Sequence, residues 1–230
     1  MMNLEKFKTQ FSDFIIDNDI IGIFESPIQL KSGRESYWYV NWRNIASDVY
    51  LMDFLTDFVI EFTEILNLKP DCFFGVPEGA TKLGVLTQFK WAKNQEDYKK
   101  YGYRLAMGRG KPKEHGAEKD RHYLGVPMGR VIVLEDVTTT GGSLIQTLNN
   151  LIELDVDIIA AISLTNRNEI RDDGSTVEDL IDKLSVKYYS MSQALELLPQ
   201  LFIRNNIDEY ITKKIQAYFK KYGQKELILK

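Results

Sequence analysis

The chain has 230 residues, of which 44% are hydrophobic, and a formal net charge of −4. This length and hydrophobic content are enough to bury a core and suit one large domain. The slight acidic excess, with an isoelectric point of about 5.4, excludes a generally basic surface. We therefore expect no nucleic-acid partner.

The single cysteine, Cys72, excludes an internal disulfide and a cysteine-based zinc site. Its setting, "DCFFGV", is typical of a buried strand, where cysteine acts as a small hydrophobic residue. The first residues are charged throughout and lack a signal-peptide core. No run approaches the ~18 apolar residues of a membrane span. We therefore expect a reduced, cytoplasmic protein without a membrane partner.

Hydrophobic periodicity predicts a helix, a strand pair, a second helix and a strand in the first part of the chain. Residues 3–17 place apolar side chains on one helical face, which Asn3 can cap. "IQLKSGRESYWYVNWR" predicts two short strands around a turn at 31–34. Residues 48–67 predict a strongly amphipathic helix, and residues 71–76 a buried strand.

The rest of the chain alternates helices with apolar strands. In chain order, we expect a helix over about 79–92, strands over 101–107 and 130–134, a helix over about 142–153 and a strand over 157–164. Residues 108–129 are polar, rich in glycine and basic residues, and predict a long loop. Residues 176–229 predict mainly helix, with a short strand at 185–190.

Alternation of strands and helices indicates a mostly parallel central sheet with helices on both faces. The expected fold class is therefore α/β, in a single domain over residues 1–230. Residues 1 to about 45 are expected to form a small subdomain beside a core of about 46–170. Residues from about 171 to 230 are expected to form a C-terminal extension.

The most informative stretch is "VIVLEDVTTTGGS", residues 131–143. Ligands of open parallel sheets bind outside the carboxyl ends of the strands, where this loop begins. The amides of the following helix, the glycines and the hydroxyls all favour a bound phosphate. Glu135 and Asp136 repel a bare phosphate, so they indicate a ligand with hydroxyls or a cation, such as a phosphorylated ribose with magnesium. An ordinary capped turn between strand and helix is the alternative.

This stretch resembles the phosphoribosyl-pyrophosphate (PRPP) signature of type I phosphoribosyltransferases. The resemblance implies their fold, in which a small N-terminal hood lies beside the core. It also implies that Glu135 and Asp136 contact the ribose hydroxyls and that the loop grips the 5'-phosphate. The loop residues are Thr138, Thr139, Thr140, Gly141, Gly142 and Ser143.

"LKSGRESYWYVN" resembles the N-terminal segment of orotate phosphoribosyltransferases within that family. The resemblance implies that Lys31 lies near the substrates, while Tyr39 and Val40 lie near the orotate ring. The alternative is a surface hairpin whose aromatic residues belong to the core. For Trp38 and Trp42 we expect that core position.

"RGKPKEHG" resembles the mobile catalytic loop of the same enzymes, which closes over the active site of the neighbouring subunit. The resemblance implies a homodimer with a lid at 108–129 acting in trans. Arg109, Lys113 and His115 then neutralise the leaving pyrophosphate, and the lid excludes water. The commoner pattern has Arg-Lys, whereas Gly110 follows Arg109 here, and Lys111 is a candidate replacement. Without the other motifs, such a basic loop predicts only a solvated face.

"SLTNRNE" follows the last core strand, where these enzymes place an arginine that pairs with the orotate carboxylate. Arg167 is the match, and an arginine fork suits a carboxylate; a surface arginine is the alternative. "GVPEGATKLG" departs from the pattern, because many relatives carry a pyrophosphate-binding lysine where Gly79 stands. Lys82 lies three residues further on, and the backbone amides of Glu78 and Gly79 remain candidates for pyrophosphate binding.

The resemblance covers about residues 4–170 and implies a transferase of pyrimidine (UMP) biosynthesis. It implies transfer of the phosphoribosyl group of PRPP to orotate, with Asp136 and the basic lid residues in catalytic roles. Mg²⁺ is expected to be held mainly by PRPP, with Asp136 nearby and no direct protein ligand. Two alternatives stay open: a phosphoribosyltransferase for another base, such as a purine, and a non-catalytic regulator that senses PRPP.

Overall fold

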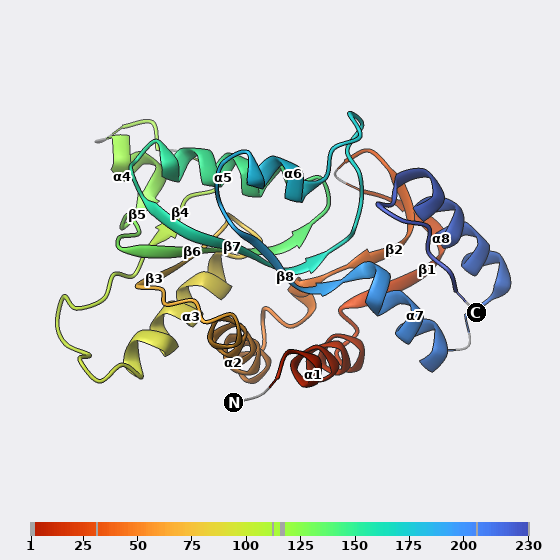
Figure 1. Cartoon of the computed structure of the whole chain (residues 1–230), viewed down its shortest axis with the longest axis horizontal. Helices are drawn as coiled ribbons and strands as arrows, with labels where there is room; N and C mark the ends of the chain where they lie inside the picture. The colour runs from red at the N-terminus through yellow and green to blue at the C-terminus, as the bar shows by residue number, and fades with distance from the viewer. Residues whose placement is uncertain (1–2, 31, 112, 116–117, 206, 230) are drawn as a thin grey trace.

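The computed structural model describes residues 3–30, 32–111, 113–115, 118–205 and 207–229. Among these residues, the centre is a parallel sheet in the strand order β3-β6-β7-β8 (Figure 1). The strands are β3 (Cys72–Gly75), β6 (Arg130–Thr138), β7 (Asp157–Asn166) and β8 (Tyr188–Gln193). The α/β class and the parallel sheet expected from the sequence are confirmed.

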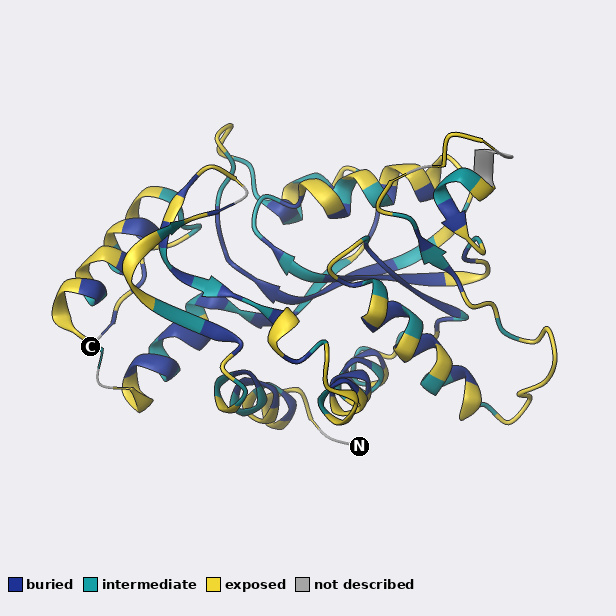
Figure 2. Cartoon of the chain, turned by 180° about the vertical axis from the view of Figure 1, so that it is seen from behind, coloured by how far each residue is buried: buried dark blue, intermediate teal, exposed yellow. Residues whose placement is uncertain are grey.

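Both faces of the sheet are buried, because its middle strands are apolar at consecutive positions. Residues 131–134 of β6 and 160–162 of β7 are 0% exposed, and these strands form the dark centre of Figure 2. Helices cover the two faces on opposite sides (Figure 1). They are α5 (Gly142–Ile152) and α6 (Val177–Asp182) on one side, and α2 (Val49–Ile65) and α3 (Thr81–Lys93) on the other. The three longer helices match the predicted ones within a few residues.

The N-terminal part adds a helix and a strand pair beside the sheet. α1 (Leu4–Asp17) begins where the Asn3 side chain accepts a hydrogen bond from the Lys6 amide at 2.8 Å, as predicted. β1 (Ile21–Gln29) and β2 (Glu35–Val40) pair antiparallel, which confirms the predicted strand pair. A short 3-10 helix, η1 (Trp42–Asn44), then leads towards α2.

The C-terminal region is mainly helical around β8, as predicted. It contains α7 (Ala194–Arg204) and α8 (Glu209–Tyr222), and β8 begins three residues later than the strand predicted at 185. α8 packs on β2, where the rings of Trp38 and Phe219 stack with centroids 5.6 Å apart. None of the described helices has the length and hydrophobicity to cross a membrane. The division of the chain near residues 45 and 170 stays a prediction.

The strand predicted over 101–107 is wrong for most of its length. Only Met107 belongs to a strand, β4 (Met107–Gly108). The alternating aromatic residues suggested a strand, but Tyr101 is 87% exposed and has no strand beside it. The ring of Tyr103 instead packs edge-on against Trp91 of α3, with centroids 5.3 Å apart.

Residues 108–129 contain more regular structure than the plain loop that the sequence predicts. α4 (Glu118–His122) is followed by β5 (Tyr123–Leu124), which pairs antiparallel with β4. The pairing brings Gly108 beside Tyr123. Tyr123 anchors it to the body of the protein, because its ring packs 6.0 Å from Phe74 of β3.

Cys72 is expected to resist thiol reagents in the folded protein. It lies fully buried in β3, and burial raises the pKa of its thiol to about 11. Since the thiolate is the reactive form, native protein at pH 8 should not be labelled, whereas denatured protein should expose one reactive thiol. Absorbance after adding an aromatic disulfide reagent measures both. Rapid labelling of the native protein contradicts the burial of β3.

Candidate functional site

A cavity of about 770 Å³ opens at the carboxyl ends of β6 and β7. It gathers most of the residues predicted to bind substrates, from four separate parts of the sequence. Those residues are Tyr39, Val40, Glu78, Gly79, Glu135, Asp136, Thr139, Thr140, Gly141, Gly142, Ser143 and Arg167. Its size suits a small-molecule site, and its place is the edge where open parallel sheets bind ligands.

The loop between β6 and α5 provides an anion site. α5 begins at Gly142 and, among the described residues, has no side-chain cap. Its first amides therefore keep their hydrogen-bonding capacity, and the positive end of the helix dipole lies at the cavity. Gly141 before it has a φ of 72°, and a Cβ there would lie 2.4 Å from Cγ2 of Val177. The entrance to α5 therefore requires glycine.

The acidic pair lies beside this anion site at the end of β6. Glu135 is 6% exposed, and Asp136 is half-buried. Oδ1 of Asp136 accepts a hydrogen bond from the Val137 amide at 2.8 Å. Helix amides and carboxylates in one cavity suit a ligand that combines a phosphate with hydroxyl groups or a bound cation.

Thr138 differs from the other loop residues, because its side chain lies in the core. β6 continues beyond residue 134 to Thr138, which is 1% exposed. Its hydroxyl lies 2.6 Å from that of Tyr188 and 3.4 Å from that of Ser163. Thr138 therefore ties β6 to the neighbouring strands, whereas Thr139 and Thr140 line the cavity.

Arg167 is a buried residue, which excludes the surface-arginine interpretation. It is 2% exposed, yet it lines the cavity. Its guanidinium carbon lies 3.7 Å from the ring centre of Trp38, and its Nε donates to Glu169 at 2.7 Å. Nη1 is buried and has no hydrogen-bond partner among the described residues. A buried charged donor without a partner is costly unless a ligand supplies the acceptor.

Comparison with known proteins identifies the family. No protein-family model matches the chain. An orotate phosphoribosyltransferase of Agathobacter rectalis is 27% identical over 237 residues, covering 96% of this chain and 100% of that protein. One of Bradyrhizobium diazoefficiens is 31% identical over 180 residues, covering 74% of this chain and 87% of that protein. The chain belongs to the orotate phosphoribosyltransferase family.

The fold is that of an orotate phosphoribosyltransferase as well. The crystal structure of the enzyme from Francisella tularensis matches with a TM-score of 0.68 at 20% identity. The match covers 93% of this chain and 99% of that one. The type I phosphoribosyltransferase fold expected from the sequence is confirmed.

The basic residues expected to form the lid of this orotate phosphoribosyltransferase do not line the cavity of their own chain. They are Arg109, Lys111, Lys113 and His115. The Arg109 amide donates to the His122 carbonyl at 2.8 Å, and the Lys113 amide to that of Arg121 at 2.9 Å, so backbone hydrogen bonds join this segment to the end of α4 in one arm. The side chains of Lys111, Lys113 and His115 are exposed. From this arm, Gly110 reaches the cavity.

Two glycines stand where the commoner orotate phosphoribosyltransferase pattern has lysine. A Cβ at Gly79 would lie 2.6 Å from both carboxylate oxygens of Asp136, and one at Gly110 would lie 2.3 Å from Oε1 of Glu78. The loop that carries Glu78 therefore packs against both Asp136 and the base of the arm. Lys82 does not replace the pyrophosphate-binding lysine that many relatives carry at the position of Gly79, because its Nζ donates to the Ala46 carbonyl at 3.0 Å.

Sequence reasoning missed the residues that support the predicted ones. Glu169 and Arg34 form ion pairs behind Arg167, and Arg171 donates from Nη1 to the Thr140 carbonyl at 2.5 Å. No short stretch of sequence marks Glu169 as the partner of Arg34, because the two residues are 135 positions apart. Lys31 lies outside the described residues.

Proposed function

We propose that the chain is an orotate phosphoribosyltransferase that forms orotidine 5'-monophosphate and pyrophosphate from orotate and PRPP, in UMP biosynthesis. One observation carries the proposal. A single cavity contains an acidic pair, the start of α5 and a buried arginine whose Nη1 has no partner in the part of the chain that the structure describes. These groups suit a carboxylate-bearing base and a phosphorylated sugar. Membership of the family supports orotate as that base.

In the proposed reaction, a ring nitrogen of orotate attacks the anomeric carbon of PRPP as the bond to pyrophosphate breaks. The ribose passes through an oxocarbenium-like state, and no covalent enzyme intermediate is needed. Glu135 and Asp136 hold the ribose hydroxyls, and the loop with the first amides of α5 holds the 5'-phosphate. Arg167 binds the orotate carboxylate near Tyr39 and Val40. Catalysis then comes from positioning and from stabilisation of charge.

Magnesium fits this site as an ion carried mainly by the substrate. Among the described residues, no cluster of three or more histidine, cysteine or acidic side chains is arranged to hold a metal. Glu78, Glu135 and Asp136 nevertheless line the cavity. Mg²⁺ keeps several waters and binds through one or two carboxylates plus substrate phosphates, which suits this set with Asp136 nearby. When bound, the ion neutralises charge on the pyrophosphate.

We further propose a homodimer in which the arm of one subunit covers the cavity of the other. Departing pyrophosphate needs cations beside it, and the arm supplies Arg109, Lys111, Lys113 and His115. Their position outside the cavity of their own chain supports action in trans. A closed arm also keeps water from the activated sugar.

An assay of orotate consumption tests the proposed function. We expect orotate to disappear when PRPP and Mg²⁺ are both present, and to persist when either is left out. Turnover of adenine or hypoxanthine but not orotate identifies a purine enzyme instead. PRPP binding without turnover of any base identifies a regulator. Either of these two results contradicts the proposal.

Replacing Gly79 by alanine is expected to raise the KM for PRPP about tenfold, which corresponds to about 1.4 kcal/mol. The added methyl group would lie 2.6 Å from both carboxylate oxygens of Asp136, so this acid has to turn away from the ribose. Stability should change little, because a side-chain end can move. Steady-state kinetics and thermal unfolding measure both effects. Gly102→Ala, an exposed position outside the cavity, is the control; an unchanged KM in Gly79→Ala contradicts the contact.

A further inference from the structure

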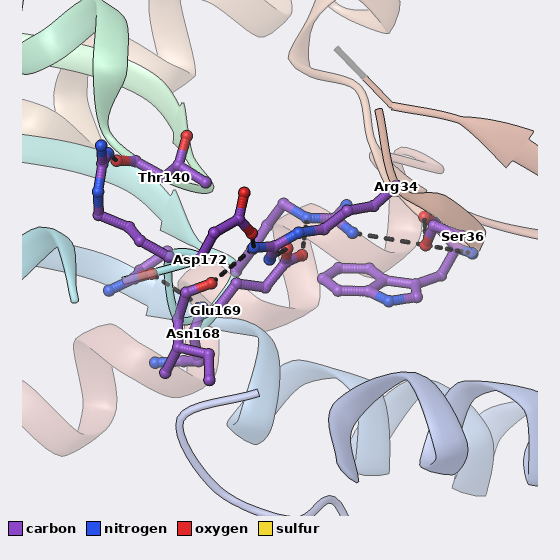
Figure 3. Close-up of polar contacts among 11 residues, drawn as sticks. Arg34, Ser36, Thr140, Asn168, Glu169 and Asp172 are labelled. Atoms are coloured by element: carbon purple, nitrogen blue, oxygen red, sulfur yellow. Dashed lines mark hydrogen bonds and ion pairs between the residues drawn. The ribbon is translucent and has the colours of Figure 1, made fainter. Parts of the chain in front are cut away.

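Arg34, Glu169 and Arg167 form a cluster of buried charged side chains, and Figure 3 shows Arg34 and Glu169 in this cluster. Its centre is Glu169, which is 0% exposed. Oε1 of Glu169 accepts from Nε of Arg167 at 2.7 Å, and Oε2 accepts from Nη1 of Arg34 at 2.9 Å. Each oxygen of one carboxylate is therefore bound to a different arginine. A buried carboxylate is tolerated in such a place only because it is paired in this way.

These contacts restrict the orientation of the Arg167 guanidinium. Its Nε is held by Glu169, its face lies on the Trp38 ring, and Nη2 lies 3.4 Å from the Ser36 hydroxyl. Nη1 is the nitrogen left without a partner among the described residues. Because the guanidinium is planar, fixing one edge and one face also fixes the direction of the remaining donors.

The C-terminal segment holds the backbone that carries Glu169. Glu169 forms an antiparallel bridge with Gly223, and the Ile170 amide donates to the Tyr222 carbonyl at 2.7 Å. The guanidinium carbon of Arg34 lies 4.5 Å from the centre of the Tyr222 ring. The same arginine donates from Nη2 to the Ile170 carbonyl at 2.8 Å. Arg34 is thus fixed both by Ile170, which follows Glu169, and by Tyr222 of the C-terminal segment.

We propose that Glu169, held in place by Arg34, is a positioning residue that orients Arg167 to recognise a planar carboxylate. Glu169 touches no substrate in this arrangement and acts through Arg167 alone. The inference rests on the proposed function, since the carboxylate is that of the base. Without the negative charge, the two arginines repel each other and Arg167 loses its Nε acceptor. The guanidinium then turns, and Nη1 no longer meets the ligand in a fixed direction.

The test is Glu169→Gln, which keeps the shape of the side chain but removes its charge. The amide group turns an NH₂ donor towards one of the two arginines, so one contact is lost. We expect the KM for orotate to rise at least about tenfold, while the KM for PRPP stays within about twofold. Glu178→Gln is the matched control. Glu178 accepts from Asn166 at 2.7 Å and from Gln224 at 3.0 Å, and from no arginine among the described residues.

Inhibition by uracil, which is orotate without its carboxylate, separates positioning from a general structural role. We expect Glu169→Gln to weaken orotate binding and to leave inhibition by uracil unchanged, so the preference for the carboxylate falls. Equal loss for both ligands, or an unchanged preference, overturns the proposal. If Glu169→Gln does not fold, Arg34→Lys tests the same arrangement with a cation retained, and the preference should again fall.

The wild-type protein separates this inference from the proposed function. An enzyme that turns over orotate, while its folded Glu169→Gln variant keeps the full preference for orotate over uracil, overturns the inference alone. A wild-type protein that binds neither orotate nor PRPP overturns both.

Discussion

Replacing Arg167 by alanine is expected to lower kcat/KM for orotate about 100- to 1000-fold, while the KM for PRPP changes less than about threefold. The substitution removes the donor proposed to bind the base, whereas the acidic pair and the start of α5 remain. It also leaves Glu169 fully buried with Arg34 as its remaining arginine partner. The free energy of unfolding should therefore fall by about 2 kcal/mol. Initial rates at varied orotate and thermal unfolding measure the two effects.

Arg204→Ala is the control for that substitution. Arg204 pairs with Asp13 and Asp17 at the surface and does not line the cavity. Its loss should leave the orotate kinetics unchanged, because exposed ion pairs contribute little. If a folded Arg167→Ala protein keeps its KM for orotate, the base lies elsewhere in the cavity.

Replacing Lys113 by alanine is expected to lower kcat about 100-fold without changing the thermal midpoint. The expected loss is that of one cation beside the departing pyrophosphate. The side chain is exposed, and the contacts that hold this part of the arm use the backbone of Lys113, so the fold should not change. Lys99→Ala removes another exposed lysine, outside the arm, and is the control. A fully active, normally folded Lys113→Ala protein contradicts the lid assignment.

Co-expression of the Lys113→Ala and Arg167→Ala chains tests whether the arm acts in trans. Each variant homodimer should be nearly inactive, but a mixed dimer contains one complete site. Random pairing should therefore restore about a quarter of the wild-type activity. Activity no higher than that of either variant alone contradicts the action in trans.

The loop between β6 and α5 could be placed from the sequence because its determinants are close together. A run of apolar residues, two acids and a glycine at a helix start specify a strand, its end and the entrance to α5. The buried position of the Thr138 side chain could not be predicted in this way. Thr138 pairs with Asn166 of β7, and this pairing extends β6 and carries the Thr138 hydroxyl into the core. Neither partner can be inferred from the loop itself.

The charges behind Arg167 could not be predicted from any short stretch. Arg34 and Glu169 are 135 residues apart in sequence, and their pairing depends on how the turn before β2 lies beside the segment that follows β7. The strand predicted over residues 101–107 was wrong for a related reason. Their aromatic pattern suits a strand, but a strand forms only where a neighbouring strand is present to pair with it.

The bridge between Glu169 and Gly223 has a consequence for the order in which the protein matures. Synthesis proceeds from the N-terminus, so Arg167 and Glu169 emerge well before Gly223, which bridges Glu169. The loop between β6 and α5 contacts β7 and Val177, which both precede residue 223, so it can form while synthesis continues. The part of the cavity proposed to bind the base gains the bridge to Glu169 only after residue 223 has emerged. We therefore expect a growing chain to form the proposed phosphate site first and the proposed site for the base last.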